Sequence, residues 1–271
     1  MTKPVFLFFP GAWHSTNFFD KVVGRLEHLG YQCVAIQLPS VGRVPPTTDL
    51  DEDIAVIRSA VLKELDAGKN VVTNAHSYAG IPVSSALHGL GTIARQRAGL
   101  LGGVVKLTYI TSFITSEGTS LLDIIGGLPN EWVVDTVRKN GSHHNLDSMT
   151  NYPTQDGNVS FQADLVDRLY HDVPREEAEE MIAALQPHAL GALQGKMKSP
   201  AAWREIPVAY MVCEEDRALP AGAQDAMIQG VKAAGADVVI ERVAASHSPY
   251  LSQPDTVVKF LLRAAGEVVD E

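Results

Sequence analysis

The chain has 271 residues, of which 45% are hydrophobic and 20% charged, and it carries a net charge of −10. This acidic balance, with Lys and Arg scattered along the chain, excludes a nucleic-acid partner, because phosphate backbones are bound by clustered basic side chains. No stretch approaches the roughly 18 apolar residues that a membrane span requires, so no membrane contact is expected.

Two further features bear on the compartment. The apolar stretch Val5–Phe9 is too short for the core of a signal peptide and is halted by Pro10 and Gly11. The two cysteines, Cys33 and Cys213, are too few for a disulfide framework, and both are expected to be buried free thiols. We therefore expect a cytoplasmic protein.

Short runs rich in β-branched and aromatic residues predict six strands. They are Val5–Phe9, Gln32–Leu38, Asn70–Ala75, Val104–Phe113, Val208–Glu214 and Asp237–Val243. Segments with helical periodicity separate most of them, and in Asp49–Ala67 the apolar residues recur every three or four positions. Strands that alternate with helices and are apolar throughout predict an α/β fold, with a mainly parallel sheet covered by helices on both faces.

One long segment interrupts this alternation. No strand is expected between Ile114 and Ile206, and the segment 114–206 is predicted to be a helical cap inserted after the fourth strand. The core would then comprise residues 1–113 and 207–271. Apolar cap residues such as Trp132 and Leu190 are expected either to line a substrate pocket or to pack the cap against the core.

The third strand runs into a serine at a strand-to-helix junction. Ser77 would sit on a very sharp turn, which needs small residues two positions before and after it, and Ala75 and Ala79 meet that need. The backbone N–H of Tyr78, at the start of the following helix, can donate to a developing oxyanion. A helix N-cap serine is the alternative, but the apolar strand before it and the helix after it favour a nucleophile.

A serine nucleophile needs a histidine base and a carboxylate that orients the base. His247 lies in the loop after the last predicted strand, at the carboxyl edge of the sheet where open α/β sheets assemble their sites. Asp216 lies just past the preceding strand. Its neighbours Glu214 and Glu215 are expected to be solvated or paired with Arg217.

The loop after the first strand, Pro10–His14, would supply a second oxyanion donor. Gly11 allows a tight backbone turn, and the N–H of Ala12 can then point at the substrate oxygen. We also expect Trp13 to contact the substrate, and His188 is a candidate to line the pocket.

Four segments together resemble the α/β-hydrolase superfamily, most closely the branch of plant methyl-ester esterases and hydroxynitrile lyases with its fungal and bacterial relatives. The segments are Pro10–His14, His76–Gly80, Glu215–Pro220 and Ser246–Tyr250. The resemblance covers the chain apart from the cap, and the order Ser, Asp, His is typical of that fold. It implies a triad of Ser77, Asp216 and His247, and an oxyanion hole formed by the N–H groups of Ala12 and Tyr78. Pro10 stands where this branch usually has a histidine that supports the loop.

The predicted function is hydrolysis of a small, hydrophobic carboxylic ester or lactone through an acyl-enzyme on Ser77. One alternative is a lyase or C–C bond-cleaving enzyme that uses the same triad. Related lyases add a lysine that stabilises a leaving anion, for which Lys196 and Lys198 are the candidates. The other alternative is a slow-turnover receptor, because fold does not fix function. No cofactor or metal is expected, the partner is a small molecule, and a homodimer is left open.

Overall fold

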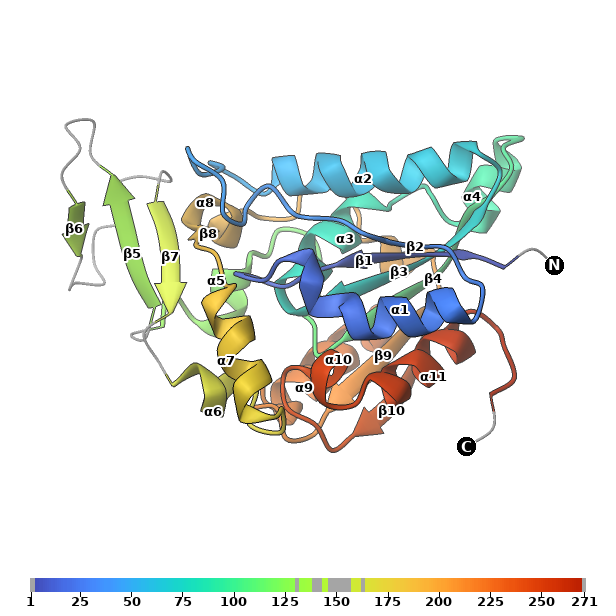
Figure 1. The fold of residues 1–271 in the computed structure, drawn as a ribbon. Coiled ribbons are helices and arrows are strands. Elements are labelled where there is room, and N and C mark those ends of the chain that lie inside the picture. Colours follow the sequence, from blue (N-terminus) through green and yellow to red (C-terminus); the bar gives the residue numbers. More distant parts are fainter. Residues whose placement is uncertain (1–2, 130–131, 138–142, 146–156, 162–163, 270–271) are drawn as a thin grey trace.

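The computed structural model describes residues 3–129, 132–137, 143–145, 157–161 and 164–269 (Figure 1). The six predicted strands all form one sheet, and every pairing within it is parallel. In sheet order the strands are β10 (Val238–Val243), β9 (Val208–Cys213), β4 (Gly103–Ile110), β3 (Asn70–His76), β1 (Val5–Phe9) and β2 (Cys33–Ala35). The predicted α/β fold is therefore confirmed.

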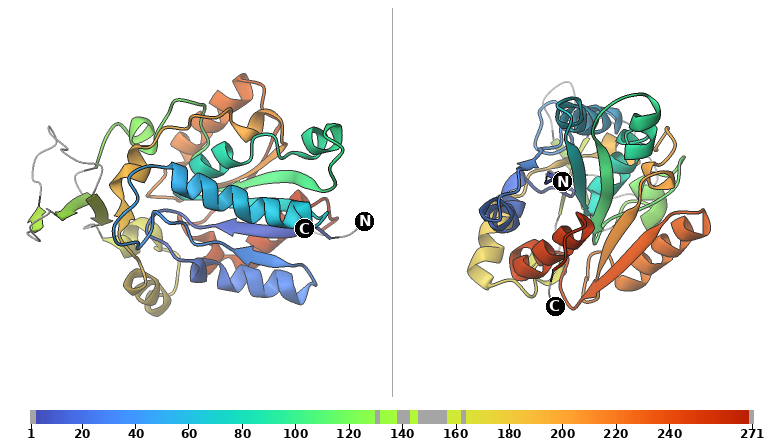
Figure 2. Two further views of the ribbon diagram at one scale, coloured as in Figure 1. Left: turned by 90° about the horizontal axis from the view of Figure 1, so that it is seen from above. Right: turned by 90° about the vertical axis from the view of Figure 1, so that its right-hand side faces the viewer.

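Helices cover both faces of this sheet (Figure 2). Side chains alternate between the two faces along β1: Leu7 and Phe9 belong to one buried cluster, whereas Phe6 and Phe8 belong to the other. The first cluster is completed by α2 (Asp51–Asp66), α3 (Gly80–Ala86) and α9 (Ala221–Ala233), and the second by α1 (Asp20–His28) and α11 (Pro254–Ala264). Short helices η1 (Thr16–Phe19), α4 (Thr92–Arg97), η3 (Ala202–Arg204) and α10 (Pro249–Ser252) complete the core. Within the described residues no helix is both long enough and apolar enough to cross a bilayer.

The segment between β4 and β9 contains both helices and strands. Its helices are α5 (Leu121–Ile125), α6 (Leu165–Leu169), α7 (Arg175–Ala183) and α8 (Leu190–Gln194). A second, antiparallel sheet joins β6 (His143–Asn145), β5 (Trp132–Val137), β7 (Gly157–Phe161) and β8 (His188–Ala189), in that order. It lies at one end of the molecule (Figure 1).

The prediction that this segment contains no strand is therefore wrong. An antiparallel strand does not need to be apolar throughout. Strand β7 has the sequence Gly-Asn-Val-Ser-Phe, and β8 has only two residues, so neither forms the apolar run by which the core strands were recognised. The insertion point after β4 agrees with the sequence, while the division at residues 114 and 207 stays a prediction.

Two strands are shorter than expected, and the end of the second bears on the site. Strand β2 has only three residues of the expected Gln32–Leu38. Strand β4 stops at Ile110 because Thr111, with a φ of 40°, turns the chain out of the sheet. Non-glycine residues seldom adopt a positive φ, and such strain is concentrated at functional sites.

Candidate active site

Ser77 occupies a sharp turn directly after β3, where the 3-10 helix η2 (Ser77–Ala79) leads into α3. Its φ of 51° lies in the left-handed region, which L-residues with a side chain occupy only under strain. The turn is supported from the end of β4, because the Ser77 carbonyl accepts hydrogen bonds from the N–H of Phe113 (3.0 Å) and from the Ser112 hydroxyl (2.7 Å).

Close backbone approaches explain why small residues surround this turn. A Cβ atom on Gly11 would lie 2.8 Å from the Cβ of Ser77, and one on Gly80 would lie 2.0 Å from the Phe113 carbonyl oxygen. Ala75 and Ala79 are completely buried. Only small side chains fit at these positions, in agreement with the sequence pattern.

Asp216 and His247 meet at the same edge of the sheet. Strands β9 and β10 end at Cys213 and Val243, and the two loops that follow place His247 Nδ1 2.6 Å from Asp216 Oδ2. The other carboxylate oxygen, Oδ1, accepts hydrogen bonds from the N–H groups of Ala218 (2.7 Å) and Leu219 (2.8 Å). Both side chains are at least 95% buried, so the carboxylate holds the imidazole in one orientation.

Thr111 is a third member of this cluster that the sequence analysis missed. Its hydroxyl donates to Asp216 Oδ2 and lies 3.2 Å from His247 Nδ1. The residue is completely buried, and its positive φ places the hydroxyl between the two side chains. The only signal in the sequence was its position at the end of a strand, at the edge where the other site residues emerge.

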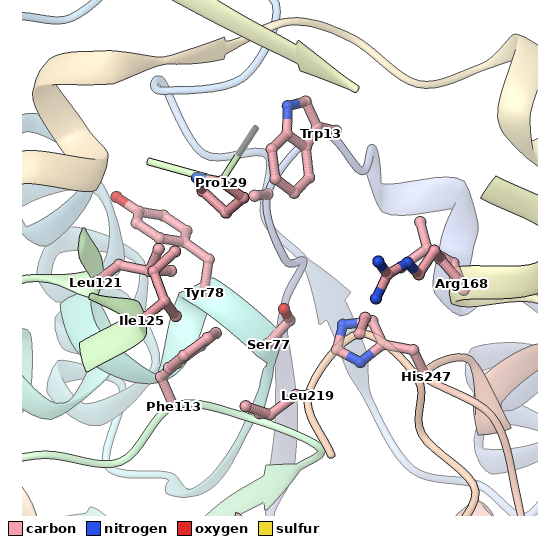
Figure 3. A pocket seen from close by; sticks show the side chains of 13 residues that line it. Trp13, Ser77, Tyr78, Phe113, Leu121, Ile125, Pro129, Arg168, Leu219 and His247 are labelled. Carbon is pink, nitrogen blue, oxygen red and sulfur yellow. The ribbon is translucent and has the colours of Figure 1, made fainter. Parts of the chain in front are cut away.

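Ser77 and His247 line one pocket (Figure 3). The Ser77 hydroxyl points into it, with the His247 imidazole beside it. Its described lining consists of Ala12, Trp13, Ser77, Tyr78, Phe113, Leu121, Ile125, Pro129, Arg168, Leu169, Ala218, Leu219 and His247. Ala12 and Tyr78, the expected oxyanion donors, thus border the same space as the serine. The cavity volume of about 140 Å³ is comparable to that of an engineered cavity of about 150 Å³ that holds benzene.

Two buried histidines support the loops around this pocket. His76 Nε2 donates to the carbonyl oxygen of His247 (3.0 Å), and His14 contacts the Ala12 carbonyl through Nδ1 (2.8 Å) and the Tyr170 hydroxyl through Nε2 (2.7 Å). Burial lowers the pKa of His14 to about 4 and that of His76 well below its ordinary value. Both rings are therefore neutral near pH 7 and hold the loop backbones by hydrogen bonds.

A second buried acid holds Tyr78, the residue that follows Ser77. Asp53, from α2, accepts hydrogen bonds from the Tyr78 hydroxyl (2.7 Å) and from the N–H (2.9 Å) and hydroxyl (2.6 Å) of Ser40. Burial raises the pKa of the Asp53 carboxyl, and burial with the neighbouring Asp53 raises the pKa of Tyr78. The Tyr78 ring, which forms part of the pocket wall, is thereby fixed.

Trp13 and His188 differ in their relation to the pocket. Trp13 lines it and donates from Nε1 to the carbonyl of Val159 in β7 (2.7 Å). His188 was expected to line the pocket, but it is not among the described lining residues. It is completely buried, and its ring centroid lies 4.5 Å from that of Tyr78. The side chain of Trp132 lies outside the described part of the structure.

Glu214 and Glu215 are both exposed, in agreement with the expectation that they are solvated. Glu214 also lies 3.6 Å from Arg242, and Arg217 pairs with Asp167. Lys196 lies 3.2 Å from Asp123 and Lys198 2.5 Å from Asp51, and neither lysine is among the described residues of the pocket lining.

The two cysteines are free thiols, of which Cys213 is buried and Cys33 is half-buried. The prediction that both cysteines are buried is therefore confirmed for Cys213, whereas Cys33 is only partly buried. Burial raises the pKa of the Cys33 thiol to about 12 and also raises that of Cys213, so neither is an activated nucleophile.

Comparisons with known proteins agree with this architecture. The chain is 33% identical over the full length of both chains to "Alpha/beta hydrolase nvfD" of Aspergillus novofumigatus. It is 24% identical to methylesterase 2 of Arabidopsis thaliana, covering 97% of this chain and 96% of the relative. The crystal structure of the methylesterase MES16 from Arabidopsis superimposes with a TM-score of 0.73 at 19% identity, covering 97% and 99% of the two chains. The model of the alpha/beta hydrolase family matches residues 6–260, and the chain therefore belongs to that family.

Proposed function

We propose that this protein is a serine hydrolase that cleaves a small, hydrophobic carboxylic ester or lactone through an acyl-enzyme on Ser77. One observation carries the proposal: the Ser77 hydroxyl and the His247 imidazole share a pocket, and the far nitrogen of that imidazole is held by Asp216 at 2.6 Å. A nucleophile, a base and an orienting acid in this arrangement are the parts that acyl transfer needs.

In the proposed reaction, His247 takes the proton of the Ser77 hydroxyl as the serine oxygen attacks the ester carbonyl. The bond to the leaving oxygen then breaks, and His247 returns the proton to that oxygen. Water, deprotonated by the same imidazole, then attacks the acyl-enzyme. The bond between the acyl carbon and the Ser77 oxygen breaks, His247 returns the proton to that oxygen, and the acid is released. Asp216 keeps the imidazole oriented and stabilises the imidazolium that forms in each half-reaction.

The N–H groups of Ala12 and Tyr78 are the proposed donors to the oxyanion of the tetrahedral intermediate. Both residues border the pocket beside Ser77, and Tyr78 begins the first turn after the nucleophile. Preorganised donors of this kind are each worth about 3–4 kcal/mol in related chemistry. The supporting contacts of His14 and Asp53 keep both positions fixed.

The substrate proposal rests on the pocket wall. Phe113, Leu121 and Ile125 present an apolar surface on one side of Ser77 (Figure 3). Such a surface favours an aliphatic or aromatic acyl group. The lyase alternative receives no support from the lysines, because Lys196 and Lys198 are both paired with acids outside the described pocket lining.

A fluorophosphonate probe tests this proposal directly. Wild type should be labelled at Ser77, as located by mass, and should hydrolyse short aryl esters. Ser77→Ala should abolish both, while Ser85→Ala, a matched change at a buried serine on α3, should retain both. Absence of label on folded wild-type protein would overturn the nucleophile assignment, and labelling without sustained turnover would support the receptor alternative.

A further inference from the structure

Arg168 contributes the charged side chain of the pocket wall: among the described lining residues it is the only Asp, Glu, Lys or Arg. It lies on α6 in the inserted segment and is half-buried. Its guanidinium points toward the space above His247 (Figure 3), and its Nη1 donates to the carbonyl oxygen of Arg217 (3.1 Å). A single cation therefore faces an otherwise largely apolar cavity.

The side of the pocket on which Arg168 lies determines which part of an ester it would contact. Tyr78, Phe113 and Ile125 lie on one side of Ser77, whereas His247 and Arg168 lie together on the other (Figure 3). In acyl transfer the base must return its proton to the leaving oxygen, so the alcohol part of an ester has to lie on the side of the histidine. The acyl part is left to the apolar wall. Arg168 thus borders the space of the leaving alcohol.

An arginine at this position favours ligands that carry a carboxylate. Its planar guanidinium is always charged and binds carboxylates with two parallel hydrogen bonds. In a cavity with largely apolar walls such a charge-assisted contact is stronger than in water, so a carboxylate on the ligand gains more from Arg168 than a neutral group of the same shape does.

We infer that Arg168 selects esters whose leaving alcohol carries a carboxylate, with a short apolar acyl group on the opposite side of Ser77. This inference rests on the proposed function. Hydrolysis of such an ester adds one water and yields the apolar acid and a hydroxy acid, with the leaving oxygen protonated by His247.

Two esters of the same shape test the selectivity. The butanoate ester of 3-hydroxybenzoate carries a carboxylate on the leaving group, and the butanoate ester of 3-hydroxybenzamide is neutral. The quantity measured is the ratio of their kcat/KM values, which we expect to be about 10–100 in wild type, as one charge-assisted hydrogen-bonded contact supplies. Arg168→Met should bring the ratio to about 1 mainly through KM, and Arg168→Lys should leave an intermediate ratio because it keeps the charge.

Arg175→Met is the matched control, because Arg175 is an exposed cation of the same segment that pairs with Glu179 (2.7 Å). It should keep the wild-type ratio. A ratio near 1 in wild type, or an equal ratio in wild type and Arg168→Met, would overturn the inference while leaving the proposed function intact.

Binding separates the two proposals further. In a Ser77→Ala background, where no chemistry occurs, 3-hydroxybenzoate should bind at least about tenfold more tightly than 3-hydroxybenzamide by calorimetry. Adding Arg168→Met should remove that difference. If wild type cleaves neither ester, the proposed function fails. If, in that background, 3-hydroxybenzoate has no advantage over 3-hydroxybenzamide, the Arg168 contact fails whatever the chemistry.

Discussion

Two buried acids, Asp216 and Asp53, each hold a residue that lines the pocket, and they differ in which residue they hold. Asp216 is 5% exposed and Asp53 is not exposed at all. Asp216 accepts hydrogen bonds from one side-chain hydroxyl and two backbone N–H groups, and Asp53 from two hydroxyls and one N–H group. Asp216, however, also holds an imidazole that borders the pocket, whereas the side-chain partners of Asp53 are the hydroxyls of Tyr78 and Ser40.

The comparison shows that burial and a shifted pKa do not identify a catalytic acid. Burial raises the pKa of Asp53, yet its partners have no proton to exchange with a substrate near pH 7, because the pKa of Tyr78 is also raised well above its ordinary value. A functional assignment needs a titratable partner that reaches the ligand space. On this reasoning we expect the Asp216 region to act in the proposed chemistry and the Asp53 region to maintain the shape of the pocket.

Asp216→Asn should have the largest effect. The amide cannot hold His247 in the required tautomer or stabilise the imidazolium, so kcat on a short aryl ester should fall by about 10³–10⁴-fold, as in other enzymes with this triad. KM should change little. Because the amide also loses an acceptor for the buried groups that donate to Asp216, the protein should be destabilised as well, and kcat is compared on the folded protein. A loss of less than tenfold would mean that Asp216 does not orient the base.

Asp53→Asn should affect stability instead. Oδ1 of the carboxylate accepts one hydrogen bond and Oδ2 accepts two, and an amide nitrogen in place of Oδ2 cannot accept the two from Ser40 and Tyr78. The free energy of unfolding, measured in urea, should fall by about 2 kcal/mol, while kcat of the folded protein changes by less than about tenfold. A loss of kcat as large as that of Asp216→Asn would contradict the inference that Asp53 only supports the shape of the pocket.

Thr111→Val should have a smaller effect, confined to the Asp216 region. It removes one donor to the carboxylate with little change in volume, and kcat should fall by about tenfold at constant KM. Thr111→Ser should restore most of the activity, because it restores the hydroxyl. In an Asp216→Asn background Thr111→Val should cost almost nothing further, whereas a purely structural role would give additive losses.

The sequence predicted the core of the molecule well, because each of its strands is an apolar run between helical segments. Ser77, Asp216 and His247 could be located because each follows a different strand at one edge of the sheet. Thr111 could not, because a threonine at a strand end has no distinctive pattern. Its contribution depends on a positive φ that only the folded backbone reveals.

The inserted segment was harder to predict. Its sheet is antiparallel, with short strands that mix polar and apolar residues, so no strand signal stood out. Arg168 was not recognised as a pocket residue for a related reason: an arginine on a short helix is usually solvated, and only the packing of α6 near His247 brings it to the cavity.

His188→Phe tests the packing around Tyr78, which both Asp53 and His188 contact, through the pH dependence of stability. His188 is completely buried, and within the described structure neither ring nitrogen has a hydrogen-bond partner. Burial lowers its pKa to about 3, against an ordinary value of 6.5. Between these values the unfolded chain binds a proton that the folded chain does not, so wild-type stability should rise with pH through this window and be lost as pH falls.

Phenylalanine has no such proton, and its ring can keep the edge-on contact with Tyr78. The free energy of unfolding of His188→Phe should therefore depend less steeply on pH between 4 and 6, by up to about 1.4 kcal/mol per pH unit. Urea unfolding at three pH values measures this slope. An unchanged slope would contradict the prediction, because it would mean that the buried ring, packed against Tyr78 and Trp13, is protonated in the folded protein.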